Sequence, residues 1–320
     1  MNKKLLVGST VILTATAVSV SVAAGFFRYF SDFAVARKQP GLPHKIKKNV
    51  DQKDFVATSS PKDIERVKQL PQEQVSIVSA DGLKLRGTIF RPENPKRAIV
   101  FMHGWRSSWK RDFALLVEPL LEMDCLLLFA EERAHGESEG QYITYGTKEK
   151  EDCVRWAQYL SQENPELPLY LWGISMGATT VMLASASDDL PENLNGIIAD
   201  CGFTNTAVQM EHLIHQNVPF GTEPILKIYG EHFRRRCDFD ISKESTTEAL
   251  AKNKRPILFF HGNADHFVPT EMSKENYTAA KAEKELVLID GAAHCKCFRI
   301  APETCFRKVS AFFARCEKKD

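Results

Sequence analysis

The sequence lacks an excess of charge of either sign. Its 320 residues include 42 Lys and Arg against 41 Asp and Glu, which leaves a formal net charge of +1 near neutral pH. Proteins that bind nucleic acid usually carry a basic patch, and a charge balance this close gives no sign of one. Internal repeats and low-complexity blocks are also missing, so the chain does not look like a repeat protein. These absences leave an ordinary globular composition without a nucleic-acid partner.

The sequence also lacks a cysteine pattern typical of disulfides or zinc. Eight cysteines are present, but Cys125 lies in the apolar run CLLLFA, and Cys305 and Cys316 share one face of a predicted helix. Free cysteine in such places behaves as a small hydrophobe. The stretch HCKC, residues 294–297, contains zinc-ligand types, but its Cys-x-Cys gap is too short and no second ligand pair is evident. We therefore expect neither a metal nor another cofactor.

A long apolar run occurs at the N-terminus. After two lysines, an uncharged stretch reaches from Leu5 to Phe27, which is long enough to cross a bilayer. A cleaved secretory signal would also explain the basic start, although the run exceeds the usual signal core, and a buried soluble helix is a third interpretation. We predict a transmembrane anchor or signal segment over residues 1–38, with the membrane as a partner. The basic residues after the run favour a cytoplasmic body, whereas signal-like segments often translocate the chain behind them, and we expect the extracytoplasmic side, or secretion if the segment is cleaved.

The remaining chain divides into a linker and one domain. Residues 39–72 contain four prolines and many charges, which predicts a linker or loose arm. From residue 73 onward, alternating residues around Asp81-Gly82 predict a hairpin, and short apolar runs then alternate with helix-length segments. This rhythm predicts an α/β domain over 73–320, with a mostly parallel central sheet flanked by helices. The runs are AIVFM (98–102), CLLLFA (125–130), LYLWG (169–173), GIIAD (196–200), PILFFHG (256–262) and ELVLID (285–290).

One insertion interrupts this rhythm. About fifty residues separate GIIAD from PILFFHG, which is too long for a simple connection. We predict a small helical lid at about 203–250, placed over the carboxyl edge of the sheet, where ligands bind in open α/β folds. His212 and His215 on this lid do not match the H-E-x-x-H order of zinc enzymes and are interpreted as lid surface.

Three loops of the predicted sheet carry a serine, an aspartate and a histidine. Ser175 lies in the stretch GISMG between a predicted strand and a helix, where a nucleophile can sit on a tight corner, although two glycines also permit a plain turn. Asp265 follows the run PILFFHG, and His294 follows ELVLID. A serine needs a base and an acid that orients it, and this order predicts Ser175 as nucleophile, His294 as base and Asp265 as acid. Asp200, which ends its own strand, is the alternative acid.

Acyl transfer also needs donors for the oxyanion. The backbone N–H of Met176 comes directly after the serine, and the N–H of Trp105 lies on the loop after the strand AIVFM, where Gly104 permits close approach. These two amides are our predicted oxyanion hole. Trp105, Trp109, Phe203 and Phe267 either line an acyl pocket or pack in the core.

Five motifs in order resemble a known family. HGW, ERAHGESEG, GISMG, HGNADHFVP and GAAH are similar to the motifs of α/β-hydrolases of the bacterial membrane-anchored, serine-esterase-like type, over about residues 75–315. The resemblance implies the α/β-hydrolase fold, the Ser175, Asp265 and His294 triad, and the Trp105 and Met176 oxyanion hole. Two positions depart from it, since Glu131 stands where Asp is usual and Cys295 where a small residue is usual. Arg133, His135 and Ser138 are interpreted as loop-structuring.

The expected function is therefore a serine hydrolase that cleaves a small-molecule carboxylic ester or other acyl substrate through an acyl-enzyme, without a cofactor. Two alternatives stay open. One is a serine peptidase, of the aminopeptidase or prolyl-oligopeptidase kind. The other is a non-catalytic binding protein with the same fold, because fold alone does not fix function.

Overall fold

An eight-stranded sheet forms the centre of the molecule, which a computed structural model describes for residues 29, 31–38, 58–217 and 221–318. The strand order is β1-β2-β4-β3-β5-β6-β7-β8. The pairs β1/β2 and β2/β4 are antiparallel, and the remaining pairs are parallel, which confirms the predicted mostly parallel sheet. The strands are β1 (Glu73–Val78), β2 (Lys84–Phe90), β3 (Arg97–Met102), β4 (Cys125–Ala130), β5 (Leu169–Ile174), β6 (Leu194–Asp200), β7 (Ile257–Gly262) and β8 (Lys284–Ile289).

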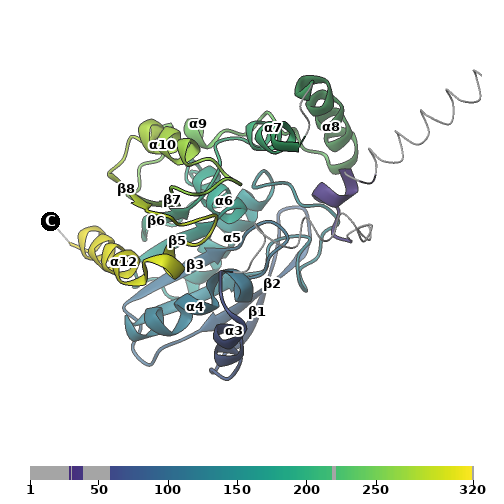
Figure 1. The fold of residues 1–320 in the computed structure, drawn as a ribbon. Coiled ribbons are helices and arrows are strands. Elements are labelled where there is room, and N and C mark those ends of the chain that lie inside the picture. The colour runs from purple at the N-terminus through teal and green to yellow at the C-terminus, as the bar shows by residue number, and fades with distance from the viewer. Residues whose placement is uncertain (1–28, 30, 39–57, 218–220, 319–320) are drawn as a thin grey trace, which may run out of the picture.

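Helices cover both faces of this sheet (Figure 1). One apolar cluster joins one face to α3, α4, α11 and α12, and a second joins the other face to α5, α6, α9 and α10. Every residue of β4, β5 and β7 is buried, as expected for parallel strands covered on both sides. The helices are α3 (Pro61–Lys68), α4 (Trp109–Glu122), α5 (Glu149–Glu163), α6 (Met176–Ala184), α7 (Thr206–Asn217), α8 (Thr222–Cys237), α9 (Thr246–Lys252), α10 (Thr270–Ala279), α11 (Cys297–Ile300) and α12 (Pro302–Cys316).

Helix α3 lies inside the stretch predicted as a linker. Ser60 and Asp63 form a reciprocal capping box, in which the Asp63 N–H donates to Ser60 Oγ and the Ser60 N–H to Asp63 Oδ2. Pro61 occupies the first helical turn, where its missing N–H costs nothing. Val67 is fully buried in the cluster shared with α4. Residues 61–68 of the stretch predicted as a linker therefore form a helix that packs on the domain, and residues 39–57 lie outside the described residues.

The predicted anchor segment, residues 1–38, is described only in its last part. The apolar run 5–27 lies outside the described residues, and among the residues that are described no helix is long and apolar enough to span a bilayer. Residues 31–37, which we call the N-terminal strap, pack on the domain. Val35 is fully buried, and Ala36 forms an antiparallel bridge with Tyr142. Residues 31–37, the last part of the predicted anchor segment, thus contact the domain.

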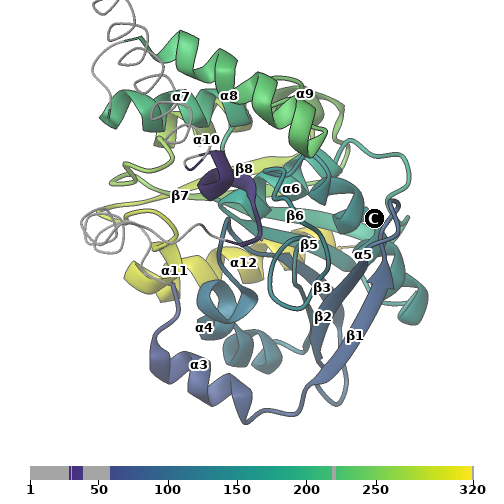
Figure 2. The same ribbon diagram turned by 90° about the vertical axis from the view of Figure 1, so that its right-hand side faces the viewer.

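The insertion after β6 contains α7, α8 and α9. Helices α7 and α8 stand apart from the sheet, and the strap lies beneath them (Figure 2). Gln209 on α7 donates to the Phe267 carbonyl in the loop after β7, whereas Phe233 of α8 packs with Val35 of the strap. Leu250 places α9 in the core of the domain. Within the predicted lid, α7 and α8 thus lie apart from the sheet, whereas α9 packs on it (Figure 2).

Candidate active site

Ser175 occupies the corner between β5 and α6. Its backbone has φ 55° and ψ −117°, a conformation that few residues other than glycine adopt and that recurs at functional sites. A Cβ on Gly173 would lie 2.0 Å from the Gly177 carbonyl oxygen, and one on Gly177 would lie 1.9 Å from that of Met102. Both glycines are therefore required sterically, because backbone atoms pass where side chains would be.

The structure brings the three predicted triad side chains together. With its proton on Nδ1, His294 donates to Asp265 Oδ2 over 2.7 Å, and its Nε2 accepts from Ser175 Oγ over 2.9 Å. Ser175 follows β5, Asp265 follows β7 and His294 follows β8. Because parallel strands end at the same edge of a sheet, these three loops meet there. The arrangement can move a proton from the serine to an oriented imidazole.

Asp265 is held by more than His294. Its Oδ1 accepts from the N–H groups of Phe267 and Val268, each at 2.9 Å. His261, at the end of β7, donates from Nε2 to Asp265 Oδ2 over 3.1 Å, while its Nδ1 accepts from Ser273 Oγ. Burial disfavours the carboxylate, but the two histidines outweigh this and lower the pKa of Asp265. His261 was not predicted from the sequence, although its place four residues before Asp265 was a usable signal.

The environment of His294 favours its protonated form. Burial by itself lowers the pKa, but the Cys201 sulfur and the Asp265 carboxylate outweigh burial and raise the pKa of His294 well above its ordinary value. The pKa of the Cys201 thiol is itself far above the usual thiol range because that residue is buried. The thiol is therefore neutral near pH 7, where the Asp265 carboxylate, which accepts from His294 Nδ1, is the charged group that favours the imidazolium. Asp265 is thus placed where its charge can stabilise an imidazolium at His294.

Asp200, the alternative acid, makes a different set of contacts. Its backbone carbonyl accepts the Ser175 N–H over 2.8 Å. Its side chain is buried, and Oδ1 has no hydrogen-bond partner among the described residues. Burial raises the pKa of this carboxyl to about 6. The carboxylate that hydrogen-bonds His294 Nδ1 is that of Asp265.

The predicted oxyanion loop lies against the serine. A Cβ on Gly104 would be 3.5 Å from Ser175 Cβ, so the loop passes within van der Waals distance. Asp112 Oδ2 accepts the Gly104 N–H over 2.7 Å and so fixes the loop. Trp105 is the next residue on this loop, and Met176 begins α6, where helix N–H groups favour negative charge. Both predicted donors therefore flank Ser175.

Side chains of the motif ERAHGESEG hold the loop after β4 in place, and one of them hydrogen-bonds the predicted oxyanion loop. Arg133 pairs with Asp152 at 2.6 Å and with Asp81 at 2.9 Å. His135 Nε2 accepts the backbone N–H of Arg106, the residue after Trp105. His135 is buried, and this burial lowers its pKa well below the usual value. A neutral imidazole of this kind can accept that N–H at any pH near neutrality.

The N-terminal strap contacts the predicted oxyanion loop. Trp105 Nε1 and the Tyr145 hydroxyl both donate to the Ala34 carbonyl over 2.8 Å. The indole and phenol rings stack, with centroids 6.4 Å apart. The strap therefore fixes the side chain of a residue that is predicted to donate to the oxyanion.

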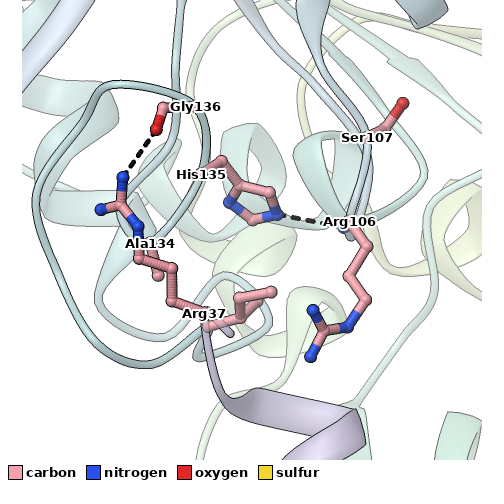
Figure 3. Close-up of a pocket in the computed structure, with 7 residues that line it drawn as sticks. Arg37, Arg106, Ser107, Ala134, His135 and Gly136 are labelled. Carbon is pink, nitrogen blue, oxygen red and sulfur yellow. Dashed lines mark hydrogen bonds between the residues drawn. The ribbon is translucent and has the colours of Figure 1, made fainter. Parts of the chain in front are cut away.

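Arginines complete the attachment of the strap (Figure 3). Arg106 Nε donates to the Phe33 carbonyl over 2.8 Å, and its Nη2 donates to the Ala36 carbonyl over 2.7 Å. From the strap itself, Arg37 donates to the Gly136 carbonyl over 2.6 Å. A pocket of about 330 Å³ lies between these groups. Its lining comprises Arg37, Arg106, Ser107, Ala134, His135, Gly136 and Ile143.

The four candidate aromatic residues separate into two groups. Trp109 is buried in the core between the sheet and α4. Trp105, Phe203 and Phe267 belong to an apolar cluster that also contains Met176. The Phe267 ring lies 4.9 Å from the His294 ring. Apolar surface therefore adjoins the serine and the histidine. The other members of this cluster are Ala134, Ile143, Tyr145, Val268 and Met272.

Comparison with known sequences identifies one matching family model and several relatives at about 24% identity. Residues 93–236 match the model of the family described as serine aminopeptidase, S33. The uncharacterized protein YqkD of Bacillus subtilis is 24% identical over 271 residues, covering 83% of this chain and 88% of the relative. Human monoglyceride lipase is 24% identical over 255 residues, covering 70% of this chain and 84% of the lipase.

Solved structures share the fold. An esterase of Pyrococcus furiosus superposes with a TM-score of 0.64 at 23% identity, covering 82% of this chain and 96% of the esterase. Est1E of Butyrivibrio proteoclasticus, solved with bound ferulic acid, gives 0.59 at 20% identity, covering 77% of this chain and all of Est1E. The chain therefore has the α/β-hydrolase fold, as the motifs implied.

Proposed function

We propose that this α/β-hydrolase cleaves carboxylic esters through a serine-bound acyl intermediate. The observation that carries the proposal is the continuous hydrogen-bonded chain from Ser175 Oγ through His294 to Asp265. A serine on a strained corner, a base within 2.9 Å and a buried carboxylate behind that base are the parts that acyl transfer requires.

In the proposed reaction, His294 Nε2 removes the hydroxyl proton while Ser175 Oγ attacks the ester carbonyl carbon. The negative charge then moves to the carbonyl oxygen, where the amides of Trp105 and Met176 can donate. Collapse of this intermediate expels the alcohol, which takes the proton from His294 and leaves an acyl-serine. Water, deprotonated by His294, attacks the acyl-serine, and Ser175 Oγ departs with that proton from His294 as the acid is released. Asp265 remains ionised and stabilises the imidazolium in both halves.

The surroundings of Ser175 support an ester with an apolar acyl group. The partly buried Phe267 ring lies 4.9 Å from the His294 ring and packs with the buried Phe203 and Met176, and apolar surroundings of this kind suit hydrocarbon better than charge. Monoglyceride lipase and the Pyrococcus furiosus esterase act on esters, as their names state. An alkoxide is also an easier leaving group than the unprotonated nitrogen anion of an amide, so an ester needs less help from His294 as general acid.

The proposal is tested by labelling the purified protein with a fluorophosphonate, which reacts with activated serines. We expect labelling of the wild type at Ser175 and none in Ser175→Ala. Failure of the wild type to label, while it remains folded, would favour the non-catalytic binding protein instead.

Aminopeptidase activity is a second candidate function, because the matching family model is described as a serine aminopeptidase. Such an enzyme must bind a free amine, and the lid offers Glu211, Glu223 and Glu231 as carboxylates. Glu231, however, is paired with Arg234 and Arg235 on its own helix. Its charge is therefore already compensated.

We expect p-nitrophenyl butyrate to be cleaved well and aminoacyl p-nitroanilides poorly. Changing the three lid glutamates to glutamine should alter ester kcat/KM by less than about twofold, because surface charges contribute little to a neutral ester. Steady-state kinetics on both substrates check this. Better kcat/KM for anilides, lost selectively in the Glu→Gln variant, would establish the peptidase instead.

Activity should rise with pH through the pKa of His294. The base works only when unprotonated, and its pKa lies above the usual 6.5. Asp265 has a lowered pKa and stays charged over this range. We therefore expect kcat/KM for p-nitrophenyl butyrate to fall on the acid side with a midpoint above 6.5. A rate that stays flat down to about pH 4 would contradict a histidine base.

Replacing Arg106 with alanine should impair catalysis although its side chain does not reach Ser175. The change removes charge-assisted hydrogen bonds to the strap, each worth about 1.5–3 kcal/mol. Loosening the loop beside Trp105 should lower kcat for esters by about 10–100-fold, because small misplacements of catalytic groups are costly. The exposed Arg235→Ala on the lid is the matched control and should leave kcat unchanged. Equal kcat in both variants would show that the strap plays no part.

A further inference from the structure

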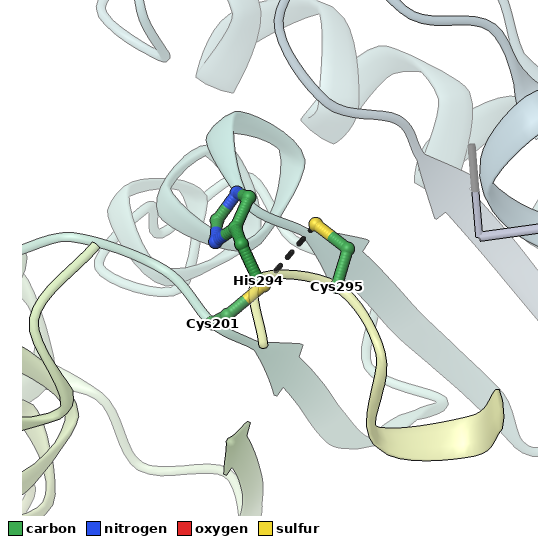
Figure 4. Close-up of side chains that lie close together, drawn as sticks. All are labelled: Cys201, His294 and Cys295. Atoms are coloured by element: carbon green, nitrogen blue, oxygen red, sulfur yellow. Dashed lines mark hydrogen bonds between the residues drawn. The ribbon is translucent and has the colours of Figure 1, made fainter. Parts of the chain in front are cut away.

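Two cysteines from separate loops meet beside the proposed base (Figure 4). Cys201 directly follows β6, and Cys295 directly follows His294. Their sulfur atoms lie 3.4 Å apart, and one nitrogen of His294 lies within 4.8 Å of both. We propose that Cys201, Cys295 and His294 form a binding site for a thiophilic divalent cation such as Zn²⁺, and that the bound ion switches off hydrolysis. The inhibitory part rests on the proposed function, whereas the binding part does not.

The backbone at both cysteines is unusual. Cys201 has φ 48° and Cys295 has φ 60°, a left-handed conformation that side chains adopt rarely because of the steric cost. Glycine would remove that cost, yet both positions carry a thiol and both thiols face each other. Such strain is typical of sites with a function. Ser175, with φ 55°, is a third example in the same place.

The ligand set suits zinc or cadmium. Thiolate and imidazole are the common zinc ligands, with bonds of about 2.3 and 2.0 Å. Two sulfurs on a tetrahedral zinc lie roughly 3.8 Å apart by these bond lengths, so the present 3.4 Å must widen by a few tenths of an ångström. Binding expels the two thiol protons, so the dication and two thiolates carry no net charge. A neutral cluster is far less costly to bury than a bare ion.

The sequence alone suggested a different set of possible metal ligands. HCKC suggested His294, Cys295 and Cys297 as ligands, with a spacing that argued against zinc. In the structure, the Cys297 thiol instead hydrogen-bonds the buried Asp200. Cys201, 94 residues before Cys295, takes its place. The carboxylates of Asp200 and Asp265 act electrostatically on this cluster, and their negative charge favours a cation.

An ion at this position would disable the triad. Both nitrogens of His294 are in use, since Nδ1 donates to Asp265 and Nε2 accepts from Ser175. A metal bond to either nitrogen breaks one of these hydrogen bonds. Neither cysteine takes part in the proposed reaction, so removing a thiol should remove the inhibition and leave the activity.

The test uses the full-length protein, reduced and freed of metal with a chelator. Cadmium gives an ultraviolet thiolate charge-transfer band, which reports binding without any measurement of activity. We expect one equivalent of Cd²⁺ to produce this band in the wild type and Zn²⁺ to abolish it by competition. In Cys201→Ala and Cys295→Ala the affinity should fall by more than about 100-fold, because a direct ligand matters more than its supporting partners. Cys316→Ser, outside the cluster, is the control and should bind as the wild type does.

Hydrolysis of p-nitrophenyl butyrate supplies the second measurement. Zn²⁺ should inhibit the wild type and the Cys316→Ser control, a chelator should restore both, and the Cys201→Ala and Cys295→Ala variants should hydrolyse the ester and resist Zn²⁺. Absence of the cadmium band, or equal affinity in the cysteine variants, would overturn the site. A band without inhibition would overturn the switch, while failure of Ser175→Ala to abolish hydrolysis would overturn only the proposed function.

Discussion

Ser175→Ala is expected to lower kcat for p-nitrophenyl butyrate by about 10⁶-fold, the loss typical of removing a nucleophile that acts as part of a triad. The variant keeps the Ser175 backbone conformation, because alanine and serine meet the same steric cost at positive φ. It loses one hydrogen bond to His294, which is worth about 1 kcal/mol. Circular dichroism and thermal unfolding should therefore show a folded protein.

The matched control for this variant is Ser273→Ala, which removes a buried hydroxyl on α10 from His261 rather than from His294. We expect it to keep most of the activity while losing comparable stability. If Ser175→Ala retained turnover near that of the control, Ser175 would not be the nucleophile and the ester mechanism would have to be abandoned.

Asp265→Asn should lower kcat by about 10⁴-fold, as expected when the group behind a catalytic histidine becomes an amide. An amide NH₂ facing Nδ1 favours the tautomer with the proton on Nε2, which cannot accept the hydroxyl proton of Ser175. The amide oxygen can still accept from Phe267 and Val268, so the loop should hold its shape. Without the carboxylate, the acid-side midpoint of the pH profile should also move down from its raised position.

Asp200→Asn is the matched comparison, because it changes the other buried carboxylate at the same sheet edge. Its Oδ1 has no hydrogen-bond partner among the described residues, and its carbonyl contact with the Ser175 N–H survives the substitution. We expect a loss of less than about tenfold, since no hydrogen bond to the base is removed. The reverse order of effects would assign the acid to Asp200.

Much of this arrangement could be predicted from sequence because it depends on periodic patterns. Continuous apolar runs predicted the parallel strands, and the loops that follow parallel strands lie at the same edge of the sheet. Ser175, Asp265 and His294 each follow the end of one of these runs by two to four residues. Their meeting was therefore predictable, and the 2.9 Å and 2.7 Å contacts agree with it.

The features that the sequence concealed depend on contacts without a pattern. The strap is held through its backbone carbonyls, which accept hydrogen bonds from Arg106, Trp105 and Tyr145. Every residue has a backbone carbonyl, so the sequence of residues 31–37 could not indicate which ones would accept. Helix α3 was hidden for another reason, because its S-P-K-D start lies in a stretch whose prolines and charges resemble a linker. The Cys201 and Cys295 pair involves 94 residues of separation, which spacing rules for short motifs cannot detect.

The position of the strap has a practical consequence for fusion proteins. Residues 31–37 enter the domain beneath α8, whereas the C-terminal helix α12 lies at the opposite end of the molecule (Figure 1). An affinity tag or reporter attached shortly before residue 31 would be joined to the segment whose carbonyls accept from Trp105, Arg106 and Tyr145. The same tag placed after α12 would be remote from these contacts. Immobilisation through the C-terminal end should therefore preserve turnover, and a load attached just ahead of the strap should lower it.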